Sequence, residues 1–204
     1  MVQELLSRRD LKIVLEIGSF LGGSVRNWLD ASKDVVVVAV DPWPDSWDVT
    51  SIARQLGKSD ELIAQLSATN GMYHTFLANL WDQQDRVIPV REYSPAILYE
   101  LQNIGLTPDL IYLDSDKTGS EIELCHQLFP GALMTGDDWG WNDETGEYPI
   151  RKPVTEFCQI HDRHLRVENA TWVIDTQPAS VRFRLRTLRR SLQKKWKTLR
   201  RRAA

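Results

Sequence analysis

The sequence predicts an α/β fold: a doubly wound sheet, mostly parallel, that ends in an antiparallel strand pair. Five short apolar segments alternate along the chain with segments of helical periodicity. That alternation is typical of parallel strands joined by helical crossovers. Near the carboxyl end of the chain, ATWVID and VRFRL flank the short turn TQPAS, which predicts an antiparallel pair.

Each element follows from a local pattern. The strands are short runs rich in branched apolar residues, and most stop at a glycine or an aspartate. The expected parallel strands are 11–17, 35–40, 86–90, 109–113 and 132–136, and the closing pair is 170–175 with 181–185. The expected helices are 24–31, 59–66, 70–83, 95–102, 120–128 and 152–161. The stretch that begins at Trp43 reads as irregular, with prolines and an acid-rich turn.

Composition places the chain among ordinary globular proteins. It has 204 residues, 42% of them hydrophobic and 26% charged, enough for one domain with a full core. No apolar run approaches the roughly 20 residues that span a bilayer, and the first residues lack the apolar core of a signal peptide. Cys125 and Cys158 lack metal-type spacing and read as reduced thiols. We therefore expect a cytoplasmic protein.

The charge is unevenly distributed along the chain. Residues 182–204 contain 11 Arg and Lys and no acid, whereas the rest holds 14 basic and 28 acidic residues. Apolar residues at helical spacing predict a basic amphipathic helix over 187–204, separate from a domain over 1–186. This helix either packs on the acidic body or attaches the protein peripherally to an anionic membrane surface or an acidic partner. The acidic body argues against nucleic acid.

Unusual residues follow the predicted strands. Gly18, Asp41, Ser94, Asp114 and Asp137 each come soon after a strand. Ligands of open α/β sheets bind beyond the carboxyl ends of the strands. The convergence of these residues therefore predicts a ligand site at that edge.

The first strand runs into EIGSFLGGS, residues 16–24. Gly18 and Gly22 allow close backbone approach to a ligand, and the following helix offers free N–H groups. Phe20 stands where a dinucleotide fingerprint would have glycine. Asp41 is placed to accept hydrogen bonds from the hydroxyls of a ribose. The alternative is that the glycines and Asp41 only form turns.

These motifs together resemble those of the class I S-adenosylmethionine-dependent methyltransferases, which have a Rossmann-like sheet. The resemblance covers nearly all of residues 11–186. It is strengthened by TFLANLW, DRVIPVREYSPAIL, DLIYLDSDK and GDDW. Among these enzymes, the chain is most similar to small-molecule O-methyltransferases of the macrocin, cephalosporin-hydroxylase-like and caffeoyl-coenzyme A types.

The resemblance implies a cofactor, S-adenosylmethionine, and a role for each matching position. Asp41 would hold the ribose, and the segment that ends at Ser94 would border the adenine, although VREYS departs from the family's usual Gly-Asp-Ser. Asp114, after the fourth strand, would also contribute. The residues around the methionine portion would be Glu16, Gly18, Ser19, Gly22 and Ser24.

The paired acids predict a second feature, an oxygen-only site for a divalent cation. Asp114, Asp137 and Asp138 follow neighbouring strands, and Mg²⁺ prefers carboxylates and water. In the metal-dependent relatives these positions hold the cation, and the lysine matching Lys117 is the proposed base. A bound cation lowers the pKa of a coordinated hydroxyl. Alternatively, Asp137 and Asp138 mark a helix start, and Lys117 is a surface residue paired with Asp116.

Loop aromatics and a long polar segment lie at the same predicted edge. Trp43, Trp47, Trp139 and Trp141 either wall an acceptor or pack as loop core. Residues 141–153 read as a lid, in which Arg151 and Lys152 would meet an anionic acceptor.

We therefore predict methylation of a hydroxyl on a small molecule or sugar, catalysed by Lys117 and Asp114. Two alternatives stay open: a hydroxylase-like oxidoreductase on the same scaffold, and a non-catalytic cofactor-binding protein tethered by its basic tail. A redox iron usually takes a His pair beside a carboxylate, and no such spacing is visible. A homo-oligomer is also compatible with the sequence.

Overall fold

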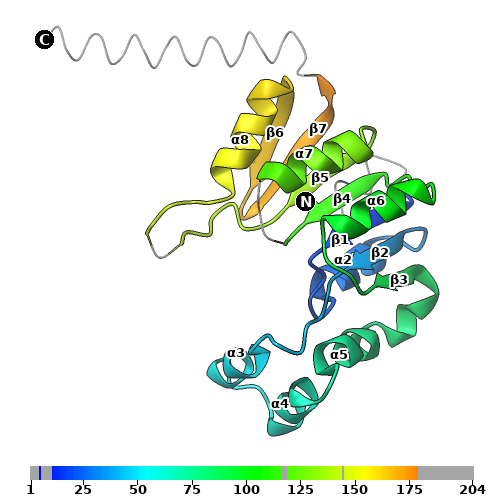
Figure 1. The fold of residues 1–204 in the computed structure, drawn as a ribbon, viewed down its shortest axis with the longest axis vertical. Helices are drawn as coiled ribbons and strands as arrows, with labels where there is room; N and C mark the ends of the chain where they lie inside the picture. The colour runs from blue at the N-terminus through cyan, green and yellow to red at the C-terminus, as the bar shows by residue number, and fades with distance from the viewer. Residues whose placement is uncertain (1–4, 6–10, 116–118, 144, 179–204) are drawn as a thin grey trace, which may run out of the picture.

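The computed structural model describes residues 5, 11–115, 119–143 and 145–178. These residues contain a seven-stranded sheet in the order β3-β2-β1-β4-β5-β7-β6 (Figure 1). The strands are β1 Ile13–Ile17, β2 Val36–Val40, β3 Val87–Val90, β4 Leu110–Leu113, β5 Leu133–Gly136, β6 Arg163–Glu168 and β7 Thr171–Pro178. The helices are α2 Gly23–Ala31, α3 Val49–Gln55, α4 Asp60–Ser67, α5 Gly71–Asn79, α6 Ala96–Asn103, α7 Gly119–Leu128 and α8 Arg151–Ile160.

The predicted fold class is confirmed. Strands β3, β2, β1, β4 and β5 run parallel to one another, and their bounds agree with the expected segments within two residues. The sequence order reverses at β1, whose neighbours are β2 and β4. The carboxyl ends of these two neighbours flank the glycine loop after β1. A parallel sheet places a ligand site at such a switch point.

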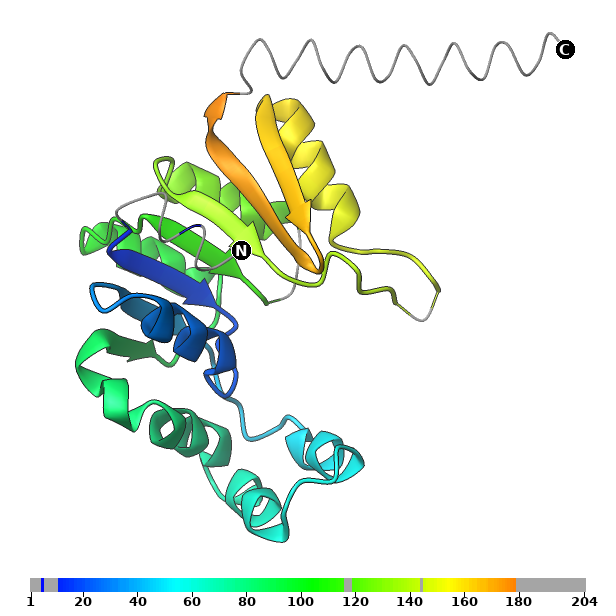
Figure 2. The ribbon, with the colours of Figure 1, turned by 180° about the vertical axis from the view of Figure 1, so that it is seen from behind.

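Helices cover both faces of the sheet. Helices α6, α7 and α8 lie over one face (Figure 1), and α2 lies on the other (Figure 2). Successive strand residues point to opposite faces, so β1 contributes Val14 to the core beneath α2 and Leu15 to the core beneath α6, α7 and α8. Both side chains have no exposed surface. The strands read as continuous apolar runs because both of their faces are buried.

The antiparallel pair is present, but its expected partner strand is different. Strand β7 pairs with β6, not with 181–185, which lies outside the described residues. Residues 163–168 were not expected to form a strand because only Leu165 and Val167 are apolar. The turn between β6 and β7 has Asn169 at φ 55°, a left-handed conformation that Asn tolerates well.

The connection between β2 and β3 also differs from expectation. It contains three α-helices, and α3 and α4 project beyond the sheet as an arm in Figures 1 and 2. Helix α3 was expected to be irregular, yet Asp48 caps it by accepting a hydrogen bond from the N–H of Ser51. The helix expected over 70–83 ends at Asn79, and a 3-10 helix follows over Trp81–Arg86.

Several predictions concern residues outside the described part. The amphipathic helix over 187–204 is one of them, so the division into a 1–186 domain and a tail stays a prediction. The candidate base Lys117 and its neighbour Asp116 are two others. Within the described residues, no helix is both long enough and apolar enough to cross a membrane.

Candidate cofactor and acceptor site

The glycine loop passes directly against the end of β4. Gly18 has φ 90°, and its N–H donates to the carbonyl of Val40 at 2.8 Å. A Cβ added to Gly18 would lie 2.4 Å from the carbonyl oxygen of Asp114. Both the left-handed backbone and this close approach therefore require glycine. Gly22, at φ 83°, immediately precedes α2. The loop therefore places the N-terminus of α2 at the carboxyl edge of the sheet.

Asp41 joins the loop after β1 to the loop after β2. Its carboxyl group accepts the N–H of Phe20 at 2.9 Å and the N–H of Trp43 at 2.7 Å. Only 2% of its surface is exposed, and this burial raises the pKa of Asp41. Each carboxylate oxygen keeps further acceptor capacity. Its predicted role as the ribose acceptor stays a prediction, and the structure adds a second role as a brace between the two loops.

Glu16 is the most deeply buried acid of the site. Its two carboxyl oxygens accept the hydroxyl of Ser24 at 2.7 Å and the indole N–H of Trp28 at 3.0 Å. Burial raises the pKa of Glu16 to about 7, despite these hydrogen bonds, which lower it. The predicted residues Glu16 and Ser24 thus contact each other, with Trp28 as an unexpected partner from α2.

The strand-end acids gather around one tyrosine. The register pairs Glu16 with Tyr112 on the neighbouring strand. The pKa of Tyr112 is raised by its burial and, to a smaller extent, by the charges of Asp114, Asp137, Glu16 and Asp138. Its hydroxyl therefore stays protonated at neutral pH and acts as a donor. Sequence reasoning missed Tyr112, although strand alternation puts it on the same face as Asp114.

Two buried polar atoms stand out at this edge. The hydroxyl oxygen of Ser19 and Oδ1 of Asp137 are the buried side-chain N or O atoms without a hydrogen-bond partner in the described part of the chain. One follows β1 and the other follows β5. A buried polar group without a partner costs about 1–3 kcal/mol. Oδ1 of Asp137 is therefore suited to a polar or cationic ligand, whereas the hydroxyl of Ser19 lies near enough to Glu16 to lower the pKa of that carboxyl group.

The predicted cation site is only partly assembled. Asp137 contributes its unpartnered oxygen, and Asp138 adopts φ 62°, which turns the chain sharply after β5. Among the described residues, no group of three or more His, Cys, Asp or Glu side chains is arranged to hold a metal ion. The donor chemistry of Asp114, Asp137 and Asp138 suits a hard cation, and the assignment stays a prediction.

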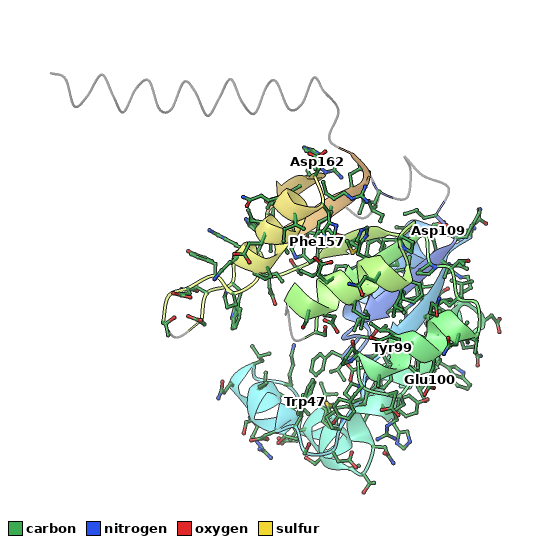
Figure 3. The ribbon with its side chains drawn as sticks, turned by 45° about the horizontal axis from the view of Figure 1, so that its top comes forward. Trp47, Tyr99, Glu100, Asp109, Phe157 and Asp162 are labelled. Atoms are coloured by element: carbon green, nitrogen blue, oxygen red, sulfur yellow. The ribbon has the colours of Figure 1, made fainter. Side chains whose placement is uncertain are left out.

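A further cluster links the loops after β3 and β4. Glu121, in the first turn of α7, accepts the hydroxyl hydrogens of Ser94 and Ser115. Glu121 is 8% exposed, which is unusual for a charged residue. A cavity of about 390 Å³ is lined by Ser94, Glu121 and residues of α6 and α7, including Tyr99 (Figure 3). Ser94 was predicted at the site, whereas Ser115 and Glu121 were missed because only the fold brings them together.

Two of the loop aromatics differ in burial. Trp43 is fully buried and packs against Tyr73 and Phe76, so it is loop core. Trp47 is 53% exposed and lies beside α3 on the arm (Figure 3).

On the opposite side of the edge, Arg151 organises the start of α8. Its Nε donates to the carbonyl of Trp139 at 2.7 Å, and its guanidinium lies over the ring of Tyr148 at 3.5 Å. Arg151 therefore stabilises the segment predicted to be a lid.

The comparisons with known proteins agree with this geometry. No family model matches the chain, and no curated protein matches it by sequence. Solved structures do match. A Staphylococcus aureus protein provisionally assigned as a caffeoyl-CoA O-methyltransferase superposes with a TM-score of 0.57 at 13% identity, covering 85% of this chain and 80% of that one.

Two further solved structures show the same architecture. The methyltransferase PaMTH1 of Podospora anserina, solved with S-adenosylhomocysteine, has a TM-score of 0.55 at 15% identity, with 85% of this chain and 75% of that chain covered. The precorrin-6y C5,15-methyltransferase of Geobacter metallireducens has a TM-score of 0.54 at 11% identity, with 85% and 83% covered. The chain therefore has the fold of the class I S-adenosylmethionine-dependent methyltransferases.

Proposed function

We propose that this protein is an S-adenosylmethionine-dependent methyltransferase that methylates a hydroxyl of a small molecule or sugar. One observation carries the proposal. The glycine loop, the buried Glu16 and the strand-end acids meet at the switch point of a sheet with the class I methyltransferase order. A mere turn-forming function for Gly18 would not require its close approach to the end of β4.

The charge of the site matches the proposed cofactor. S-adenosylmethionine carries a cationic sulfonium, a cationic amine and an anionic carboxylate at its methionine end, so its net charge is positive. Asp114 and Asp137 are half-buried carboxylates just beyond β4 and β5, where attraction to a cation is stronger than in bulk water. Glu16, whose pKa is about 7, adds a carboxyl group that is partly ionised at neutral pH. Ser19 lies in the loop that would face this end.

The transfer is a direct displacement at carbon. An oxygen of the acceptor forms a bond to the methyl carbon while the carbon–sulfur bond breaks, and the electron pair remains on sulfur as S-adenosylhomocysteine forms. The acceptor hydroxyl gives up its proton, and we assign its removal to Lys117, with Asp114 beside the reacting group. Alignment of acceptor and methyl supplies most of the remaining acceleration.

The proposal also includes a divalent cation held by Asp114, Asp137 and Asp138. When bound, such a cation would lower the pKa of the acceptor hydroxyl. The unpartnered Oδ1 of Asp137 supports the assignment because a carboxylate oxygen buried without a donor is suited to a cation.

Methyl transfer is tested by incubating the protein with S-adenosylmethionine carrying a labelled methyl group and a panel of catechols and sugars. Label in any acceptor supports the proposal and excludes the non-catalytic alternative. An oxidised acceptor without label would favour the oxidoreductase. Hydrolysis of the cofactor without labelled acceptor, across catechols and sugars alike, would count against O-methylation.

The cation is tested separately by calorimetric titration with Mg²⁺. We expect heat of binding in the wild type that disappears in Asp137→Asn/Asp138→Asn. Asp34→Asn is the matched control, because Asp34 pairs with Lys12 near the start of β2. Methyl transfer with no Mg²⁺ response in the wild type would leave the base alone responsible for deprotonation.

A further inference from the structure

We propose that Glu121 is a positioning residue that makes the site selective for an amino-substituted purine over an oxo-substituted one. The inference rests on the proposed function, since it concerns the adenine end of the same cofactor. It is carried by the hydrogen bonds that join Glu121 to Ser94 and Ser115.

Glu121 connects two loops that β1 and β2 keep apart in the sheet. Strands β3 and β4 are not neighbours, because the order is β3-β2-β1-β4. Ser94 follows β3, Ser115 follows β4, and each donates its hydroxyl hydrogen to a different oxygen of the same carboxylate. The bridge therefore fixes both hydroxyls relative to each other across the carboxyl edge of the sheet.

The bridge lies next to the cofactor loop. A Cβ on Gly18 would be 3.0 Å from the backbone nitrogen of Ser115, so Ser115 lies directly against the glycine loop. On the other side, Ser94 and Glu121 line the cavity of about 390 Å³ that runs between α6 and α7. A planar base entering from the glycine loop toward β3 would meet the two hydroxyls.

The carboxylate of Glu121 determines whether the two serine hydroxyls can donate a hydrogen bond to a ligand or only accept one. An ionised carboxylate only accepts hydrogen bonds, whereas a serine hydroxyl has a single hydrogen and two lone pairs. Because Ser94 and Ser115 both commit their hydrogens to Glu121, each has only lone pairs left for a ligand. Two lone pairs match the exocyclic amino group of adenine, which donates. They oppose the oxo group of hypoxanthine, which accepts.

The experiment compares S-adenosylhomocysteine with S-inosylhomocysteine, in which an oxo group replaces that amino group and the neighbouring N1 carries a hydrogen. Both are titrated calorimetrically into the full-length wild type and Glu121→Gln. We expect the wild type to prefer the adenosyl ligand by at least about tenfold, the effect of one lost hydrogen bond facing an unpaired acceptor. The Gln amide donates to one of the two hydroxyls and frees its hydrogen, so the preference should fall about tenfold.

Glu100→Gln is the matched control. It is the same substitution on the neighbouring helix α6, but Glu100 is exposed and does not line the cavity beside the serines. We expect this variant to keep the wild-type preference. A general loosening of α7 would weaken both ligands together and leave their ratio unchanged, so the ratio separates positioning from a structural role.

Ser115→Ala provides a second variant in case Glu121→Gln does not fold. It removes one acceptor and should weaken the adenosyl ligand more than the inosyl ligand. A wild type that binds S-adenosylhomocysteine, with a preference unchanged in Glu121→Gln and Ser115→Ala, would overturn the role of Glu121 and leave the proposed function standing. A wild type that binds neither ligand would overturn the proposed function itself.

Discussion

Glu16 is a buried carboxyl group whose pKa of about 7 makes folding depend on pH. The folded state holds its proton up to about pH 7, whereas the unfolded chain loses it near the ordinary glutamate pKa of 4.5. Between these values the native state binds more protons, so stability falls as pH rises and then levels off above pH 7. This difference in pKa between the folded and unfolded states corresponds to about 3 kcal/mol in the free energy of unfolding.

We expect Glu16→Gln to remove this dependence. Urea unfolding of the wild type and the variant at several pH values between 4.5 and 8 measures it. The wild type should lose stability relative to the variant by about 3 kcal/mol over this range. A difference between the two proteins that is the same at every pH would show that Glu16 does not titrate there.

Gly18 provides the second prediction at the residue scale. Gly18→Ala should abolish binding of S-adenosylhomocysteine and destabilise the fold, because Cβ would lie 2.4 Å from a backbone oxygen. Gly57→Ala is the control, since Gly57 also has positive φ, at 62°, but has open space around it. This variant should lower the free energy of unfolding only by the cost of placing alanine in a left-handed conformation, about 1–2 kcal/mol, and should leave binding intact. Equal losses of stability in the two variants would contradict the close approach of Gly18 to β4.

At the scale of the element, Arg86, the last residue of the 3-10 helix before β3, links that helix to the end of α2. Its guanidinium donates to the carbonyls of Ser32 at 2.7 Å, Leu29 at 3.1 Å and Val35 at 3.3 Å. These carbonyls lie at or just beyond the last turn of α2, where backbone acceptors lack helical partners. A positive charge at a helix C-terminus also interacts favourably with the helix dipole.

Arg86→Met should therefore lower the free energy of unfolding by about 2 kcal/mol, which is within the range for hydrogen bonds to a charged group. Arg54→Met is the matched control. Arg54 is exposed on α3, and its guanidinium donates at 3.4 Å to the hydroxyl of Thr50 rather than to a backbone carbonyl, so its loss should lower the free energy of unfolding by less than about 1 kcal/mol. Chemical denaturation of both variants measures the difference. A larger loss in Arg54→Met would contradict the capping role of Arg86.

The elements also show where sequence reasoning succeeds. The five parallel strands were predicted because burial on both faces gives each a continuous apolar run. Strand β6 was missed because it lies at the sheet edge, where Arg163, His164 and Arg166 dilute the apolar signal. Helix α3 was missed because it is short and buries only Val49 and Ala53, while its larger apolar residue Ile52 is 56% exposed, so its apolar residues do not mark one core face.

The residues of the site can likewise be separated into those that the sequence predicts and those that it does not. Residues that directly follow a strand were predictable, because parallel strands bring their carboxyl ends to one edge. Tyr112 and Glu121 were not. Tyr112 acts within a strand, and its relation to Glu16 depends on the register between β1 and β4. Glu121 reaches Ser94 and Ser115 only through the packing of α7 against the sheet, which local sequence does not encode.

For the whole molecule, the sheet order, the glycine loop and the acidic strand ends all point to one edge. Each of these features occurs in other proteins for other reasons. Their combination at the switch point beside β1 is what favours a cationic nucleoside cofactor. The solved structures support the fold, and cofactor binding by this chain is the central claim that depends on it.

Calorimetric titration of the wild type with S-adenosylhomocysteine tests that claim most directly. We predict saturable binding with a dissociation constant in the micromolar range, and loss of that binding in Gly18→Ala but not in Gly57→Ala. A folded wild-type protein that gives no heat of binding would contradict cofactor binding at this site.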